Sequence, residues 1–244
     1  MKDKGSRKQA MSTLWIIRHG QASFGDSNYD KLSELGQAQS RILGKYLRKT
    51  GVVFDKVYTG DMSRQTETAM IALAEMDENA KPAETITDPA FNEYDHQSII
   101  TALLPGLMED EPAMNDILPN IFKDNREFQK MFGKIVDRWV SGQYETPGAE
   151  SFKDYVSRVE QGLAQAAEKG DGSQIGIFTS GGVVSVAMKT ALGLSDEEAM
   201  RLGWWVKNTA VTVLERRKGR FNLMSFNGLA HLEMENRPEL MTYR

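Results

Sequence analysis

The chain has 244 residues, and its 30 lysines and arginines against 34 aspartates and glutamates give a net charge of −4. This mild acidity argues against a dedicated nucleic-acid binder, which usually carries a basic excess. The sequence contains no cysteine, which excludes disulfides, thiolate catalysis and cysteine-ligated metal sites. Its histidines are His19, His96 and His231. They form no recognisable carboxylate–imidazole cluster, so we expect no metal and no cofactor.

The N-terminal residues 1–12 are predicted to form a disordered tail. This basic start is followed by the apolar run Leu14–Ile17, which is too short for the apolar region of a signal peptide. No run of about 18 apolar residues is present. We therefore expect a cytoplasmic protein that has neither a membrane nor a nucleic acid as a partner.

An alternation of strands and helices follows the tail. Leu14–Ile17 ends abruptly at Arg18-His19-Gly20, as a buried strand does when it opens into a loop. Further elements are a helix from Ser33 to Gly51, a strand over Val52–Thr59, a helix from about Ser63, a strand over Ile175–Thr179 and a helix over Val183–Leu192. This order predicts a parallel sheet covered by helices.

The C-terminal part predicts a closing hairpin, because Val211–Glu215 and Phe221–Phe226 flank the polar turn Arg217–Arg220. The expected fold class is α/β, with three layers in which a mostly parallel sheet is flanked by helices. We expect residues 13–244 to form a single domain.

The segment over about 92–148 departs from the alternation, and we interpret it as an insertion. It is rich in proline, and helical spacing resumes only between Phe128 and Val140, with a long helix after Ala149. We expect this helical and loop segment to lie over the strand ends, where insertions often cover a site. A core-packing helix with solvated loops is an equally weighted alternative.

Polar residues follow three predicted strands, at Arg18-His19-Gly20, Thr59–Arg64 and Thr179–Gly182. Ligands of open α/β sheets bind beyond the carboxyl ends of the strands. The arginine fork suits phosphate oxygens, and a helix N-terminus adds backbone donors. Arg18 and Arg64 therefore predict a phosphate pocket.

His19 would be placed in that pocket to attack phosphorus through a ring nitrogen. Neighbouring arginines favour the neutral, nucleophilic imidazole. On spacing alone, however, a plain turn after a strand is the preferred interpretation of this tripeptide. Asp61 is equally suited to cap the helix that carries Arg64 and to contact a substrate.

A family resemblance changes this weighing. The segments that carry it are, in order, LWIIRHGQAS, LSELGQAQ, YTGDMSRQTETA, FNEYD, GAESFKDYVSR, IFTSGG and NTAVTVL. Together they resemble the histidine phosphatase superfamily, also called the phosphoglycerate mutase-like fold, over about residues 14–232. The Arg-His-Gly after the first strand and the S-R-Q-T-x-T-A helix start are specific in combination.

The resemblance implies that His19 is transiently phosphorylated, that Arg18 and Arg64 hold the phosphoryl group, and that Glu93 is the general acid. We further expect substrate binding by Gly20, Gln21, Ser23, Ser180 and Gly181.

Two positions depart from the family pattern. Ser180 stands where the family has a second histidine, and its hydroxyl can bond a phosphoryl oxygen but carries no charge. Ala22 stands where many members have a hydroxyl residue, which Ser23 is a candidate to replace.

His96 follows Glu93 by three residues, a spacing that puts two side chains on one face of a helix. We hypothesise that His96 fills the space that the family histidine would occupy at Ser180. A surface histidine in a loop is the alternative. His231 matches a histidine near the end of many members and is interpreted as structural. Trp204 and Trp205 are expected to pack in the core or the cover.

The leading interpretation is a metal-independent phosphatase that acts on a small-molecule phosphate ester or another phosphorylated substrate. A non-catalytic phosphoryl-ligand binder or interaction protein of the same fold is the alternative, supported by Ser180. A phosphoglycerate mutase-type phosphotransferase is less favoured. Neither the substrate nor the oligomeric state follows from the sequence.

Overall fold

The computed structural model describes residues 11–23, 30–82, 84–114, 125–168 and 172–243. They divide into two compact units. The first holds the described residues up to Glu93, together with Val159–Leu194 and the segment from Glu198 onward. The second holds the described part of Tyr94–Arg158 and Ser195–Glu197. The insertion predicted over 92–148 falls almost wholly within this second unit.

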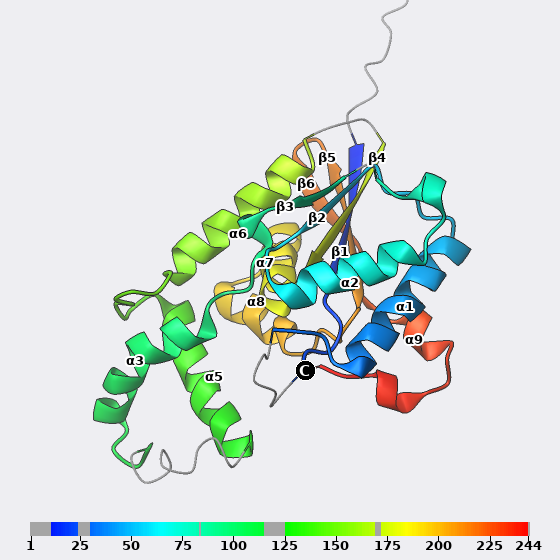
Figure 1. The fold of residues 1–244 in the computed structure, drawn as a ribbon. Helices are drawn as coiled ribbons and strands as arrows, with labels where there is room; N and C mark the ends of the chain where they lie inside the picture. The colour runs from blue at the N-terminus through cyan, green and yellow to red at the C-terminus, as the bar shows by residue number, and fades with distance from the viewer. Residues whose placement is uncertain (1–10, 24–29, 83, 115–124, 169–171, 244) are drawn as a thin grey trace, which may run out of the picture. The chain divides into compact units, whose positions relative to one another are not determined.

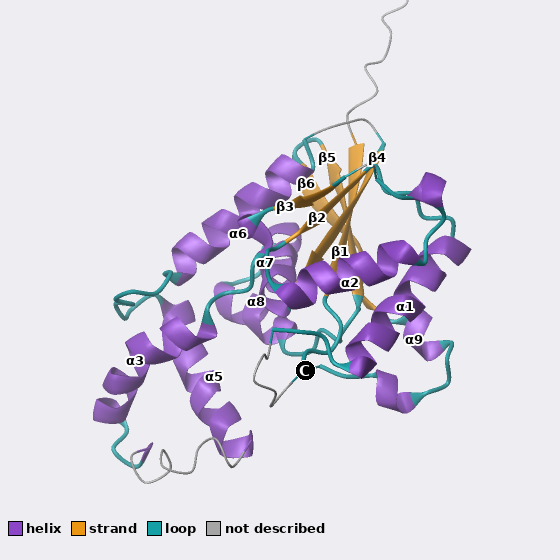
Figure 2. Ribbon diagram, viewed as in Figure 1, coloured by secondary structure: helices purple, strands orange, loops and turns teal. Residues whose placement is uncertain are grey.

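Among the described residues of the first unit, six strands form one mixed sheet (Figures 1 and 2). They are β1 (Met11–Arg18), β2 (Lys56–Thr59), β3 (Thr85–Thr87), β4 (Ser173–Thr179), β5 (Val211–Arg217) and β6 (Arg220–Gly228). Across the sheet the order is β3-β2-β4-β1-β5-β6. The first four are parallel, whereas β5 and β6 are antiparallel. The predicted α/β class, mostly parallel sheet and closing hairpin are confirmed.

Several strand boundaries differ from the prediction. β1 begins at Met11, and Ser12 is buried in it, so the strand starts before the expected end of the tail; residues 1–10 lie outside the described part. β2 begins at Lys56 rather than at Val52. The edge strand β3 was not predicted, because three residues are too few to show a periodic pattern.

The helices of the described chain are α1 (Glu34–Lys49), α2 (Ser63–Ala74), α3 (His96–Asp110), α5 (Asn125–Ser141), α6 (Phe152–Ala166), α7 (Gly181–Leu192), α8 (Asp196–Gly203) and α9 (Ala230–Glu233). Short 3-10 turns lie at Glu78–Ala80, Pro89–Phe91 and Pro238–Leu240. Within this part of the chain, none of these helices has the length and apolar character that crossing a membrane requires.

Helix α1 shows why the sequence marks its ends clearly. The Ser33 side chain accepts a hydrogen bond from the Gly36 amide, as an N-cap does, and Arg48 and Lys49 lie in the last turn. Gly51 follows with a φ of 71°, a left-handed conformation that glycine adopts without strain.

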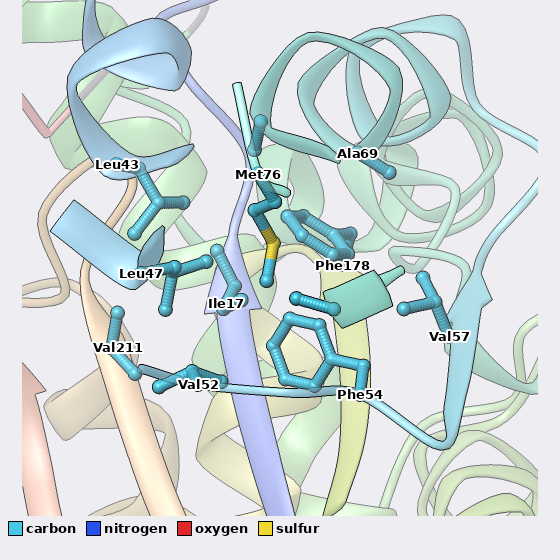
Figure 3. Close-up of a cluster of buried hydrophobic side chains, with 12 residues drawn as sticks. Ile17, Leu43, Leu47, Val52, Phe54, Val57, Ala69, Met76, Phe178 and Val211 are labelled. Carbon is cyan, nitrogen blue, oxygen red and sulfur yellow. The ribbon is translucent and has the colours of Figure 1, made fainter. Parts of the chain in front are cut away.

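Helices α1 and α2 cover one face of the sheet. Figure 3 shows Leu43 and Leu47 of α1 and Ala69 of α2 packed with Ile17 of β1 and Phe178 of β4. Each large side chain buried in this way contributes about 1.5–3 kcal/mol. This packing fixes α2 against the ends of β1 and β4.

The opposite face of the sheet is apolar as well. Leu14 and Ile16 alternate with the residues of the first face and are fully buried. Helix α7 and the C-terminal half of α6 lie on this side (Figure 1), with Val159, Leu163 and Val183 also fully buried. The predicted three-layer arrangement is therefore confirmed.

The second unit is helical. Asp95 caps α3 by accepting hydrogen bonds from the Gln97 and Ser98 amides. Helix α3 was not predicted from the sequence, because Pro105 lies inside it and interior proline normally argues against a helix. The placement of this unit over the strand ends stays a prediction.

Trp204 and Trp205 do not lie in the core, which was one of the two places expected for them, and packing in the cover stays a prediction. Trp204 is 42% exposed and Trp205 is 65% exposed. Both follow directly after α8, where Gly203 packs closely against Ser185 of α7.

Candidate active site

The candidate site begins where β1 and β4 end side by side. Arg18 and Thr179 are register partners in the parallel pair, and the His19 amide donates to the Thr179 carbonyl at 2.8 Å. His19 and Ser180 therefore continue the register at the same edge of the sheet. Gln65 in the first turn of α2 reaches this edge, with its Nε2 2.8 Å from the Ser180 Oγ.

Both ring nitrogens of His19 have defined partners. Nδ1 lies 2.7 Å from the Gly20 carbonyl oxygen, and the Arg64 Nε lies 3.2 Å from Nε2. A carbonyl oxygen only accepts, so Nδ1 carries the hydrogen and Nε2 keeps its lone pair. The side chain of this 7% exposed residue is thus held with one nitrogen toward the arginine.

The surroundings of His19 keep the ring neutral. Burial lowers its pKa well below the ordinary value, and the charges of Arg64 and then Arg18 lower it further, while the hydrogen bond to the Gly20 carbonyl acts in the opposite direction. The predicted neutral form of His19 is therefore supported by the geometry.

Gly20 is fixed by the close approach of α1. A Cβ at Gly20 would lie 2.5 Å from the Gly36 carbonyl oxygen, so only glycine fits. The Gly20 amide donates to the Thr68 Oγ1 at 3.0 Å, and this hydroxyl donates to the Arg64 carbonyl at 2.6 Å. Thr68 therefore links the backbone of Gly20 to the backbone of Arg64 through its hydroxyl.

Arg64 is shared between His19 and a carboxylate that was not predicted from the sequence. Its Nη1 lies 2.6 Å from the Asp30 Oδ1, and the Ser63 amide donates to the Asp30 Oδ2 at 2.7 Å. Asp30 therefore orients Arg64 and also bonds the N-terminus of α2, the capping role for which the sequence offers Asp61. The helix dipole favours a carboxylate there.

Arg18 is held by backbone carbonyls from the C-terminal part of the chain. Its Nη2 donates to the Tyr243 carbonyl at 2.6 Å, and its Nη1 donates to the Val206 carbonyl. A Cβ at Gly181 would lie 3.8 Å from the Arg18 Nε. The guanidinium therefore lies against the N-terminus of α7.

Glu93 reaches the same helix N-terminus, because its Oε2 accepts from the Gly182 amide at 3.0 Å. Ser180, which precedes this helix, is fully buried. The structure thus brings Arg18, Ser180, Gly181 and Glu93 together at the start of α7.

Gln21 and Ser23 lie in the loop after Gly20. The Gln21 amide donates to the Gln39 Oε1 at 2.9 Å, and the Gln21 side chain accepts from Ser33. The Ser23 amide donates to the Lys31 carbonyl at 2.8 Å. Substrate contacts by either side chain stay predictions.

His96 is the first residue of α3 in the second unit, where it is exposed and its ring meets the Phe132 ring edge to face, with centroids 6.4 Å apart. Because the helix begins at His96, Glu93 lies outside it. The two residues would share a helix face only if residues 93–96 were helical, and this condition is not met. The hypothesis that His96 replaces the family histidine stays a prediction.

His231 is buried, with its Nε2 2.9 Å from the Thr209 Oγ1. Burial lowers its pKa to about 4. The Thr209 amide donates to the His19 carbonyl at 3.3 Å, and Thr209 itself has a φ of 57°. His231 thus supports the backbone behind His19, in keeping with a structural role.

No group of three or more metal-ligating side chains of the kind that holds an ion occurs in the described ranges.

The model of the histidine phosphatase superfamily, branch 1, matches residues 14–228 of the chain. The chain belongs to this family. A 2,3-bisphosphoglycerate-dependent phosphoglycerate mutase from Methylobacterium sp. (strain 4-46) is 31% identical over 154 residues, which is 60% of this chain and 63% of that relative. The match thus covers less than two thirds of the relative's length.

Solved structures of a mutase and a phosphatase share the fold of this chain. Phosphoglycerate mutase from Bacillus anthracis str. Sterne gives a TM-score of 0.60 at 17% identity, covering 94% of this chain and 99% of that one. A mutant phosphoserine phosphatase from Entamoeba histolytica, in complex with phosphoserine, gives 0.61 at 17% identity, covering 91% and 99%. The family and fold that the sequence motifs predicted are confirmed.

Proposed function

We propose that this histidine phosphatase family member hydrolyses a small-molecule phosphomonoester through a phosphohistidine at His19. The observation that carries the proposal is the arrangement of the His19 ring. Nδ1 donates to the Gly20 carbonyl, and the lone pair of Nε2 accepts a hydrogen bond from the Arg64 Nε, which an incoming phosphoryl group would displace. A neutral imidazole held in this way is a nucleophile directed at an anion bound by the arginine.

In the first step, the His19 Nε2 attacks phosphorus, and the bond from phosphorus to the leaving oxygen breaks. An acid protonates that oxygen, and Glu93 and His96 are the candidates for this role. Water then attacks phosphorus in the second step and gives a proton back to the acid that was deprotonated in the first. The phosphorus–nitrogen bond breaks, and inorganic phosphate and the free imidazole are formed.

The arginines supply most of the assistance in this scheme. Phosphoryl transfer depends mainly on positioning and on stabilisation of charge, and Arg18 and Arg64 present planar forks for phosphoryl oxygens. The substrate must then compete with Asp30 for Arg64, whose Nη1 the carboxylate holds at 2.6 Å. It must likewise compete with the Val206 and Tyr243 carbonyls for Arg18.

Two other functions share these residues. The phosphoglycerate mutase named among the relatives favours transfer of the phosphoryl group to a second acceptor instead of water. Ser180 in place of the family histidine favours a non-catalytic binder of phosphoryl ligands. A mutase and a binder would use the same anion-binding residues as a phosphatase. The three functions differ in what happens to the phosphoryl group.

Trapping the intermediate tests the proposal. The protein is mixed with p-nitrophenyl phosphate, quenched in alkali and analysed by mass spectrometry before and after acid treatment. We expect an acid-labile adduct on His19, steady release of phosphate, and loss of both in His19→Ala. The His231→Gln variant is the matched control and should keep the adduct.

Two outcomes would favour the alternatives. Interconversion of phosphoglycerate isomers with 2,3-bisphosphoglycerate, without net release of phosphate, would assign the mutase. Phosphate binding with neither adduct nor turnover would assign the binder. Undiminished turnover in His19→Ala would end the covalent mechanism.

A further inference from the structure

Gln65 is a fully buried polar residue in the first turn of α2 to which the mechanism above assigns no role. Its Nε2 lies 3.1 Å from the Phe91 carbonyl oxygen and 2.8 Å from the Ser180 Oγ. The carbonyl oxygen only accepts, so the amide nitrogen must be the atom that faces it. The same nitrogen therefore donates its second hydrogen to Ser180.

This assignment fixes what the Ser180 hydroxyl can do. Its oxygen accepts from Gln65, so its own hydrogen is left to be donated elsewhere. Because Ser180 follows the strand residue that pairs with Arg18, it lies next to His19 at the sheet edge. The hydrogen is thus left for a partner at the edge of the sheet where His19 lies.

The position of Gln65 is itself fixed. The Thr179 Oγ1 donates to the same Phe91 carbonyl at 2.6 Å, which ties the end of β4 to the Pro89–Phe91 turn. The Gln65 Oε1 is buried with no hydrogen-bond partner among the described residues, and a Cβ at Gly60 would lie 2.0 Å from it. The amide is therefore wedged between Gly60 and Ser180.

An unpartnered buried amide oxygen costs stability, so folding alone does not favour glutamine here over an apolar residue of equal length. We propose that Gln65 is a positioning residue that turns the Ser180 hydroxyl into an uncharged hydrogen-bond donor for a phosphoryl oxygen. The amide–hydroxyl pair takes the place of an imidazole. The inference rests on the proposed phosphoryl pocket and does not depend on turnover.

A double-mutant cycle on the full-length protein tests whether Gln65 acts through Ser180. The dissociation constant of inorganic phosphate is measured by calorimetry for wild type, Ser180→Ala, Gln65→Met and the double variant. One neutral hydrogen bond corresponds to about a three- to tenfold change in affinity. We expect each single variant to weaken binding by about this factor, and the double variant to bind no more weakly than Ser180→Ala.

Gln39→Met is the matched control. Gln39 is also fully buried and donates to a carbonyl and a hydroxyl, those of Leu240 and Thr242, but it has no bond to Ser180. Its effect on phosphate affinity should be the same factor in the wild-type background and in the Ser180→Ala background. In the Gln65 cycle, by contrast, the effect should vanish once the serine hydroxyl has been removed.

Should Gln65→Met fail to fold, Gln65→Glu provides the same test. A carboxylate would accept the Ser180 hydrogen and turn the donor away from the ligand, so its effect should be larger in the wild-type background than in the Ser180→Ala background. Equal effects in the two backgrounds, or a wild type that binds no phosphate, would overturn the inference. Coupled phosphate binding without phosphoenzyme or turnover would uphold Gln65 and refute the phosphatase.

Discussion

Asp30 and Arg64 form an ion pair of 2.6 Å in which the arginine also reaches His19. The carboxylate therefore sets the direction from which the guanidinium approaches the candidate nucleophile. It also lies at the N-terminus of α2, through the Ser63 amide. One side chain thus combines orientation of the site with stabilisation of the helix.

Removing the Asp30 carboxylate should affect both activity and stability. Loss of a helix cap costs about 1 kcal/mol, so urea unfolding of Asp30→Ala should show a loss of about this size. We also expect kcat to fall, because Arg64 loses its orientation. Asp30→Asn keeps an acceptor for the Ser63 amide and should retain more stability than Asp30→Ala. Wild-type stability and kcat in Asp30→Ala would refute both roles.

The two arginines should each be essential for transition-state stabilisation. Arg18→Ala and Arg64→Ala should each lower kcat/KM by about 10²–10³-fold, the scale of a lost oxyanion donor. Arg64→Lys should restore only part of the loss, because lysine lacks the planar fork. Steady-state kinetics with p-nitrophenyl phosphate measure this. Full activity in Arg64→Lys would mean that the pocket senses charge alone.

The pH dependence of kcat/KM should reflect the lowered pKa of His19. Burial and the neighbouring arginines favour the neutral ring, so the nucleophilic form persists as the pH falls through about 6.5, the ordinary value for histidine. We expect no loss of activity from His19 protonation in that range. A decline centred near pH 6.5 that shifts in Arg64→Ala would contradict the assigned environment.

His231 should make the folded state sensitive to acid. Its pKa is lowered to about 4 by burial, whereas an unfolded histidine titrates near 6.5. The stabilisation is present above the unfolded pKa and is lost as the pH falls from about 6.5 to 4, a change of about 3 kcal/mol. The free energy of unfolding, measured with urea at several pH values, should show a smaller slope against pH for His231→Gln than for wild type. An unchanged slope would exclude His231 as the source.

The hypothesis for His96 makes a separate prediction about turnover. His96→Ala should lower kcat by about 10²–10⁴-fold, the usual scale of a positioned acid or base, and Ser180→Ala should cost less. In the His96→Ala background, Ser180→His should restore activity only together with Gln65→Ala, because the Gln65 amide fills the space beside residue 180. Normal turnover in His96→Ala would leave Glu93 as the remaining candidate acid.

Local signals in the sequence were sufficient for most of the first unit. Ser33 and Gly51 mark the ends of α1, and the apolar run before Arg18 marks β1. The same signals failed for α3, where Pro105 conceals a helix, and for β3, which is too short to show a period. Trp204 and Trp205 show that apolar type does not fix burial.

The candidate site was predictable as far as its motifs extend. His19 and Arg64 lie together because β1 and β2, the strands that precede them, flank β4 in the same parallel part of the sheet. Asp30 carries no comparable signal, since it lies in a polar loop and meets Arg64 only in the folded chain. The contact between Gln65 and Ser180 joins residues 115 positions apart, and only tertiary packing determines it.

Thr209 is a strained residue that holds the backbone behind His19. A β-branched residue at a φ of 57° is strained, at a cost of about 1–3 kcal/mol. Its amide bonds the His19 carbonyl, and its hydroxyl bonds His231. Glycine at this position would relax the backbone but would lack the hydroxyl that anchors it to His231. A substitution at Thr209 that relieves the strain would improve thermal tolerance. The same substitution would loosen the backbone behind His19.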